Sequence, residues 1–455
     1  MADQQPISED CLFLNVFAPH RSPSAEQNKT FPVLVVIHGG AYEIGSSARY
    51  TKYEVIGQRF VTDANSRGIV FVSIQYRLGV MGFATTGDEE LPGNLGIWDQ
   101  ISALQFVKDN IAEFGGDPSR VTVFGYSAGS GSTALLSISP KSRGKEIEKR
   151  KAKLKKKGNP HRLDRELFPQ DYPEMIATAP PKKMIMGFAE LDFLLFSLIS
   201  SKNNSISMLA LTDEQIANYD QKAFEASVSE FVVKEKYFGN QTNEVKAEIV
   251  HFYVNEYLPA ETVKDQKFFV LLYTTCQLTD QKPTFLISMP SRHSKNRAQQ
   301  IWASDEIQKK GPAYHGFDHS LIFYDEFTKK SEEDRKMSEY LVTAIKNFVI
   351  NGDPSTETIR WDQLTDFPSI ERVEKVQHMR MEAKKTGMVD GMKAELRRAR
   401  FWRELAKKYT NFDLVRGTFP EKSGQSAAFV PSAQFAQIFS IFAIVAIISL
   451  NNGIY

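Results

Sequence analysis

The stretch Arg120-Val-Thr-Val-Phe-Gly-Tyr-Ser-Ala-Gly129 decides how the rest of the chain is interpreted. Its β-branched run at residues 121–124 predicts a strand, and the residues that follow Gly129 predict a helix. A Gly-x-Ser-x-Gly motif between a strand and a helix is typical of a nucleophile elbow, in which a strained turn exposes the serine hydroxyl. Glycine fits both flanking positions because a side chain would collide there. Ser127 is therefore a candidate nucleophile, and the alternative is a glycine-rich turn without a chemical role.

The neighbouring segments predict an α/β fold. Unbroken apolar runs at residues 31–37 and 69–76 are typical of strands buried on both faces, and residues 8–17 also have the composition of a strand. Residues 95–114 carry apolar side chains at helical spacing. Strands that alternate with helices predict a mostly parallel central sheet with helices on both faces.

The second half of the chain continues this pattern less regularly. A short strand is predicted at residues 181–188. Helices are predicted within residues 212–258, 331–350 and 379–408. We predict one domain over residues 1–418 that contains an irregular basic insert at 141–166, followed by a small and polar linker with an apolar C-terminal tail at 419–455.

Charge is distributed unevenly along the 455 residues, although the formal net charge is only +1. Residues 141–166 hold twelve Lys or Arg and four Asp or Glu, a local charge of +8, so the remainder carries −7. A mildly acidic body with one basic block is not typical of a nucleic-acid-binding protein. The block is interpreted as a solvated insert, with a binding patch as the alternative.

The two cysteines, Cys11 and Cys276, provide neither a disulfide framework nor a metal-ligand spacing. No metal or cofactor is expected. Sequons at Asn28, Asn203 and Asn240 permit a secretory route, and the first residues lack the pattern of a signal peptide.

The C-terminal tail is the longest apolar stretch. Residues 435–450 are predominantly apolar and follow the small, polar segment 423–428. Sixteen residues are short for a membrane-spanning helix, which needs about 20. The pattern favours the removable tail of a glycolipid-anchor signal. A marginal transmembrane helix and a buried core helix are the alternatives. Membrane attachment through this tail, in the secretory pathway or at the cell surface, is therefore an expectation.

Acyl transfer by a serine requires a base, a carboxylate that orients the base, and amide donors for the oxyanion. The chain offers Ser127, then Asp192 after the predicted strand at 181–188, and then His315 in a loop.

Several long motifs in order resemble the carboxylesterase type B (cholinesterase-like) family of α/β-hydrolases. They are Ser8-Glu-Asp-Cys-Leu-Phe-Leu-Asn-Val-Phe17, His38-Gly-Gly-Ala-Tyr-Glu-Ile-Gly45, Gln75-Tyr-Arg-Leu-Gly-Val-Met-Gly-Phe83, Gly93-Asn-Leu-Gly-Ile-Trp-Asp-Gln-Ile-Ser-Ala-Leu104 and Asn110-Ile-Ala-Glu-Phe-Gly-Gly-Asp-Pro118. The resemblance covers residues 7–140 densely and residues 168–415 more loosely. In this family the nucleophile, the acid and the histidine follow in that chain order.

The resemblance implies a role for each candidate. Ser127 would be the nucleophile, and Gly187-Phe-Ala-Glu-Leu-Asp192 would place the acid at Asp192, where the family usually has glutamate. His315, followed by glycine as in the family, would be the general base. The oxyanion donors would be the amides of Gly40, Ala41 and Ala128.

Some assignments have competitors in the sequence. Glu190 could replace Asp192 as the acid, and His319 lies four residues after His315. His38 is interpreted as a residue that packs or orients the loop and not as a base. The resemblance pairs Cys11 with an upstream cysteine. None precedes it in this sequence, so we expect an unpaired thiol unless it reaches Cys276.

The chain also departs from the family pattern. Residue 1 falls inside that pattern, so the family's signal peptide and first strands are expected upstream of it. After residue 140 the family continues with a helix and a central strand, and the basic block stands in that place. Loss of a central strand would leave the neighbouring edges unpaired. Tyr126 stands where cholinesterases carry glutamate, which favours uncharged esters over choline esters.

These features predict a serine carboxylesterase that hydrolyses small-molecule esters through an acyl-serine intermediate. The alternative is a catalytically impaired, cholinesterase-like adhesion protein of the cell surface. A fragment that does not fold stably is a third reading.

Overall fold

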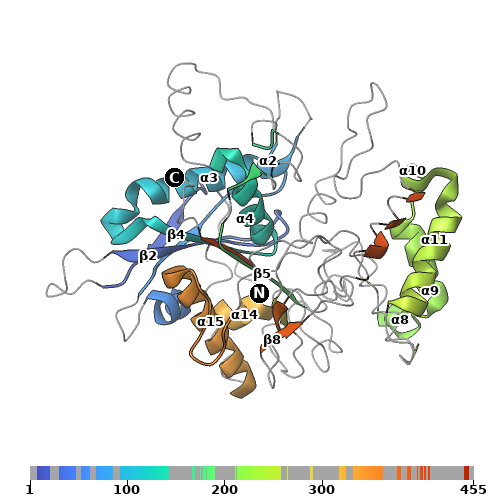
Figure 1. The fold of residues 1–455 in the computed structure, drawn as a ribbon. Coiled ribbons are helices and arrows are strands. Elements are labelled where there is room, and N and C mark those ends of the chain that lie inside the picture. Colours follow the sequence, from blue (N-terminus) through green and yellow to red (C-terminus); the bar gives the residue numbers. More distant parts are fainter. Residues whose placement is uncertain are drawn as a thin grey trace.

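The computed structural model describes a large part of the chain. The described residues are 8–20, 30–47, 53–61, 68–85, 93–142, 167–169, 175, 178–180, 182–189, 211, 213–257, 264, 287–289, 317–323, 332–361, 377–380, 387–390, 397, 400–402, 404–405, 408–409 and 445–449. Within them, a nine-stranded sheet lies between helices on its two faces, and a further group of helices lies to one side (Figure 1).

The sheet has the strand order β1-β3-β2-β4-β9-β5-β6-β7-β8. Strands β2 to β7 all run in one direction, whereas β1, β8 and β9 run against their neighbours. Of these three, β1 and β8 lie at the edges and β9 lies in the interior. The strands are β1 (Leu14–Phe17), β2 (Phe31–Ile37), β3 (Val70–Ile74), β4 (Gly116–Tyr126), β5 (Met184–Ala189), β6 (Ile287–Met289), β7 (Gln377–Arg380), β8 (Gly387–Asp390) and β9 (Val445–Ser449).

The helices of the described residues fall into those that cover the sheet and those of the separate group. Helices near the sheet are α1 (Tyr53–Ile56), α2 (Gly79–Phe83), α3 (Leu95–Asn110), α4 (Ala128–Ile138), α14 (Phe317–Phe323) and α15 (Glu332–Asn351), with the short turns η1 (Gly57–Val61), η2 (Ile111–Phe114) and η3 (Pro140–Ser142). The group consists of α8 (Asp213–Ala217), α9 (Gln221–Ser227), η5 (Val228–Val232), α10 (Glu235–Phe238), η6 (Gly239–Gln241), α11 (Thr242–His251) and η7 (Phe252–Glu256).

The central strands are buried on both faces because alternate side chains enter two different cores. In β2, Val33, Val35 and Ile37 pack in the core under α3 and α4. Leu34 and Val36, which point the other way, pack in the core under α14 and α15. This explains why the sequence shows continuous apolar runs instead of alternation, and it confirms the predicted α/β architecture.

The best-patterned predictions agree with the structure. The predicted strand at 31–37 has the same bounds as β2, and the run at 69–76 contains β3. The helix predicted at 95–114 comprises α3 and the 3-10 turn η2, and Gly115 ends it with a φ of 83°. The helix predicted at 331–350 is α15.

Two predictions need correction. Of the strand predicted at residues 8–17, only Leu14–Phe17 pairs with the sheet, because β1 lies antiparallel against the short strand β3. The region at 379–408 is not one helix. It contributes to β7, which pairs with β6 and β8, and it becomes helical only from about residue 397 among the described positions. The charged residues of this region favour a helix locally. Residues 377–390 form strands instead, because β7 pairs with the distant strand β6 and with β8.

The C-terminal segment supplies β9, the strand between β4 and β5. Thr122 to Tyr126 pair with Ser449 to Val445 on one side, and Met184 to Gly187 pair with Ile448 to Val445 on the other. The departure from the family pattern after residue 140 predicted unpaired edges in the middle of the sheet. In the structure the facing edges of β4 and β5 are both paired with β9. Within the described part of the chain, every helix is too short or too polar to span a bilayer. The division into a domain and a tail stays a prediction.

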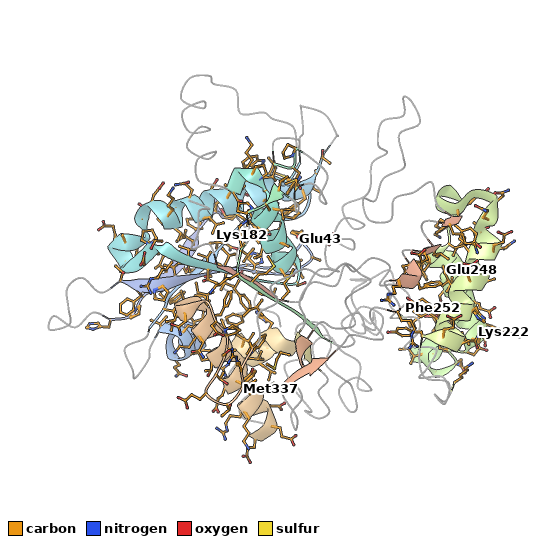
Figure 2. All side chains as sticks on the ribbon, in the orientation of Figure 1. Glu43, Lys182, Lys222, Glu248, Phe252 and Met337 are labelled. Carbon is orange, nitrogen blue, oxygen red and sulfur yellow. The ribbon has the colours of Figure 1, made fainter. Side chains whose placement is uncertain are left out.

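The helical group has a core of its own. Phe252 stacks on Phe401 with ring centroids 4.0 Å apart, and the buried indole nitrogen of Trp402 donates to the Tyr253 hydroxyl at 2.9 Å. Glu248 accepts hydrogen bonds from Lys408 and Tyr409, and both Glu248 and Phe252 are marked in this group in Figure 2. Residues near 400 thus return to helices formed about 150 residues earlier.

Candidate active site

Ser127 lies at the junction of β4 and α4. Its backbone has φ 53° and ψ −127°, a conformation that side-chain-bearing residues rarely adopt. The carbonyl of Ser127 accepts hydrogen bonds from the amides of Ser130 and Gly131, so helix α4 begins directly after the turn. The sequence therefore folds into the strand, strained turn and helix that the motif predicted.

Close backbone contacts explain the glycines around this turn. A Cβ at Gly125 would lie 2.0 Å from the carbonyl oxygen of Gly129, and one at Gly129 would lie 2.1 Å from that of Ile37. A Cβ at Gly39 would lie 2.7 Å from the Cβ of Ser127. The last contact was not anticipated from the sequence. It shows that the loop after β2 passes directly beside the serine.

The loop after β2 forms a tight turn. The amides of Glu43 and Ile44 both donate to the carbonyl of Gly40 at 3.0 Å. Gly40 has φ 122°, and a Cβ there would lie 1.9 Å from the carbonyl oxygen of Ile44. Ala41 and Tyr42 follow with φ of 56° and 62°. This conformation curls the backbone of the predicted oxyanion loop at the end of β2.

Backbone strain among the described residues concentrates at this place. Four non-glycine residues have positive φ, namely Ala41, Tyr42, Asn94 and Ser127. Three of the four belong to the loop after β2 or to the serine turn. Each such conformation costs about 1–3 kcal/mol and persists only where the surroundings enforce it. The clustering marks this edge of the sheet as the candidate site.

His38 and Tyr76 support the loop from beneath. Their rings stack with centroids 4.5 Å apart, and the Tyr76 hydroxyl donates to the backbone carbonyl of His38 at 2.8 Å. Nδ1 of His38 lies 2.8 Å from the carbonyl oxygen of Gly39. Burial lowers the pKa of His38 to about 4, so the ring is neutral at pH 7. These contacts fit a residue that orients the loop.

The buried His38 is expected to make the chain sensitive to acid. Its pKa is about 4 in the folded state and 6.5 when exposed, so the unfolded chain binds the extra proton between these values. The free energy of unfolding therefore falls as the pH decreases from 6.5 towards 4. We expect wild type to lose roughly 2–3 kcal/mol more than His38→Asn between pH 7.5 and pH 4.5, measured by urea denaturation.

Asparagine serves as the matched control because its amide can donate to the Gly39 carbonyl but does not titrate. His38→Asn can be less stable than wild type at pH 7.5 without affecting the result, since only the difference between the two pH values matters. Equal losses for the two proteins would show that His38 does not carry this pH dependence.

An ion pair fixes the segment that leaves β3. The guanidinium of Arg77 donates two hydrogen bonds of 2.7 Å to the buried carboxylate of Asp99 on α3, and the amide of Arg77 donates a third at 3.0 Å. The amide of Gly79 donates to the carbonyl of Tyr42 at 2.7 Å. The loop after β2 is thereby connected through α2 to α3.

The predicted base falls just outside the described residues. His315 and Asp192 both lie outside the described residues, whereas the competitor His319 lies in α14 and is buried. The ring of His319 packs on Tyr126 with centroids 3.7 Å apart and on Phe323 at 4.9 Å. The helix that begins two residues after His315 is therefore in contact with the residue that precedes Ser127.

Strand β5, which precedes the predicted acid in the sequence, ends at the same edge of the sheet as β4. Tyr126 and Gly187 both pair with Val445, so they lie level with each other on either side of β9. Both strands run in the same direction, and β5 ends at Ala189, three residues before Asp192. Glu190 also lies outside the described residues.

No three His, Cys, Asp or Glu side chains in the described part of the chain are grouped so that they could hold a metal ion. Cys11 is a free thiol, and Cys276 lies outside the described residues.

A model of the carboxylesterase family matches residues 1–150 and 145–402. The chain belongs to the carboxylesterase family. The two matched stretches meet inside the basic block, where the sequence departs from the family pattern. Membership confirms the predicted family, the α/β-hydrolase fold and the class of carboxylic ester hydrolase.

Named relatives of this carboxylesterase-family chain are esterases. It is similar to Gut esterase 1 of Caenorhabditis elegans, with 25% identity over 486 residues that cover 90% of the chain and 82% of the relative. Identity reaches 52% with Esterase cest-33 of C. elegans over 138 residues, 30% of the chain and 24% of the relative. It is 47% with Acylcarnitine hydrolase of Rattus norvegicus over 139 residues, 30% of the chain and 23% of the relative. These higher-identity matches span about a quarter of each relative.

Proposed function

We propose that this member of the carboxylesterase family hydrolyses small, uncharged carboxylic esters through an acyl-enzyme at Ser127. His315 acts as the base, Asp192 orients it, and the amides of Gly40, Ala41 and Ala128 bind the oxyanion. The observation that carries the proposal is the strained backbone of Ser127, φ 53° and ψ −127°, at the β4–α4 turn with Gly39 directly beside it.

The reaction proceeds in two balanced halves. The Ser127 hydroxyl oxygen attacks the ester carbonyl while its proton moves to His315, and the carbonyl oxygen becomes an oxyanion. The carbon–oxygen bond to the alcohol then breaks, and the alkoxide takes the proton from the histidine. Water attacks the acyl-serine in the same manner, which releases the carboxylic acid and restores the serine hydroxyl.

Amide donors are supported by the local backbone. Ala128 is the first residue of α4, and the amides of a helix's first turn have no partner within the helix. Gly40 and Ala41 lie in the curled loop that passes next to Ser127. Donors held in this way need no reorganisation when charge develops, and loss of one such donor typically lowers kcat by about 10²- to 10³-fold.

Chain connectivity supports the histidine and the acid. His319, which touches Tyr126, lies four positions after His315, and a span of four residues reaches at most about 14 Å. Asp192 follows a strand that ends at the same edge of the sheet as Ser127. A carboxylate here would stabilise the imidazolium that forms during attack.

Preference for uncharged esters rests on Tyr126. This residue stands where glutamate would offer an anionic neighbour, and its ring packs into the core against His319. The described structure therefore presents no carboxylate at this position beside the nucleophile. A secretory route belongs to the same proposal, and the sequon residue Asn240 is exposed in η6.

A fluorescent alkyl phosphonofluoridate tests the proposal directly. We expect wild type to be labelled once per chain, with the label on the peptide that contains Ser127 and none on Ser127→Ala. The alternative, a non-catalytic adhesion protein, predicts no labelling of wild type and no hydrolysis of p-nitrophenyl acetate. Ser130→Ala is the matched control because its hydroxyl donates to the Ser127 carbonyl and is itself buried. Equal labelling of wild type and Ser127→Ala would reject the assignment.

A further inference from the structure

The C-terminal strand β9 occupies the place beside the nucleophile strand. It pairs along Thr122 to Tyr126 of β4, the last five residues before Ser127, and along four residues of β5. It also contacts α4, the helix that follows Ser127. One five-residue segment from the end of the chain thus touches both elements that form the serine turn.

The pairing of β9 with β4 and β5 contributes to stability through backbone hydrogen bonds. Strand β4 bonds to β2 on one side, so its other side requires a partner inside the sheet. An unpaired buried backbone group is destabilising, and several would be left unpaired at once along β4 and β5 without β9. Among the described strands, only β9 bridges these two.

The direction and register of β9 place its first residue at the end of β4 that leads into Ser127. Because β9 runs against β4, Val445 lies opposite Tyr126 and Ser449 lies opposite Thr122. The chain therefore enters the sheet at the end where Ser127 is located. Ala446 lies between Gly125 of β4 and Met186 of β5, so the smallest residue of β9 faces the first glycine of the serine motif, at the level where α4 approaches β4.

A hydrogen bond also links the start of β5 to helix α4 across this strand. Lys182, just before β5, donates to the carbonyl of Ser137 at the end of α4 at 2.5 Å (Figure 2). The helix after the nucleophile is thus attached to the strand that precedes the predicted acid. This hydrogen bond thus links α4 to the start of β5, and β9 pairs with β4 and β5 between them.

We infer that residues 445–449 are an integral strand of the catalytic unit that positions the serine turn. The same residues cannot pair with β4 and β5 while they cross a bilayer or after removal of an anchor signal. The active protein therefore retains its C-terminal segment in the sheet. This inference uses the proposed function only for one of its two readouts.

Two proline variants of the same apolar tail test the inference. Ile447 pairs with Phe124 and Ile185, so Ile447→Pro removes an amide from the middle of the strand. Ile438→Pro is the matched control, because it makes the same change in the same tail outside β9. Both positions lie within the apolar run 435–450, so a membrane segment there would contain both substitutions.

Amide hydrogen exchange in the full-length chain is the first readout. We expect exchange in peptides covering 116–126 and 184–189 to accelerate by about tenfold or more in Ile447→Pro but not in Ile438→Pro. Peptides covering 242–257, in the separate helical group, serve as the internal reference. Loss of protection throughout Ile447→Pro, with Ile438→Pro unchanged, would also support an integral strand.

Phosphonate labelling of Ser127 is the second readout and should fall with the loss of protection. Absence of labelling in wild type would count against the proposed function alone, because the exchange measurement would still report on β9. If the amides of β4 and β5 in Ile447→Pro were as well protected as in wild type, the inference would be overturned. Equal effects of both prolines would overturn it as well and would favour a continuous membrane segment.

Discussion

Replacing His315 with asparagine is expected to lower kcat/KM for p-nitrophenyl acetate by about 10³- to 10⁴-fold. Without the imidazole, nothing accepts the serine proton during attack or returns it to the leaving alcohol. The remaining rate would come from the oxyanion donors and from substrate binding. The measurement is steady-state hydrolysis at pH 7.5, with unfolding by urea as the check that the variant is folded.

His319→Phe is the discriminating companion to this variant. Phenylalanine keeps an aromatic ring against Tyr126 and Phe323, where His319 is buried, but it has no titratable nitrogen. We expect kcat/KM to stay within about tenfold of wild type. A severe loss in His319→Phe with little loss in His315→Asn would transfer the base to His319.

Gly125→Ala is expected to destabilise the chain by about 3 kcal/mol or more and to abolish esterase activity. Its Cβ would lie 2.0 Å from the carbonyl oxygen of Gly129 and 2.4 Å from Oγ1 of Thr133. Neither group can retreat easily, since Thr133 donates to that carbonyl and both belong to the first turns of α4. The helix would have to move away from β4 and take Ser127 with it.

Gly57→Ala provides the control for the same chemical change. Nothing lies within 4 Å of a Cβ at Gly57, which begins the helical turn η1. We expect its free energy of unfolding to change by less than about 1 kcal/mol, towards stability if the shorter range of unfolded conformations dominates. Urea midpoints of the two variants decide the comparison. Similar midpoints would mean that α4 tolerates displacement from β4.

Local patterns were sufficient for much of the fold. The apolar runs that became β2 and β3 have no polar face, because their alternate residues enter two cores on opposite sides of the sheet. The helix at residues 95–114 and its end at Gly115 could also be predicted from the sequence, because a helix is formed by contacts between residues a few positions apart.

Part of the candidate site could be predicted for the same reason. The elbow at Ser127 depends on a short motif whose glycines are required by contacts within the turn, at Gly125 and Gly129. The approach of Gly39 to Ser127 could not be predicted from local sequence, because the two residues follow different strands and lie about 90 positions apart. The roles of Asp192 and His315 stay predictions, since both lie outside the described residues.

Sequence by itself determined the alternation of the main strands and helices up to α4, the burial of the central strands and the strained serine turn, because each follows from residue types at short spacing. Only the tertiary structure decided where the C-terminal segment goes and that residues 377–390 are strands. A short apolar run satisfies a membrane, a core helix or a central strand equally well. Which of these forms depends on the groups that pair with the backbone of the run. For β9 these groups are the backbones of β4 and β5 on either side of it.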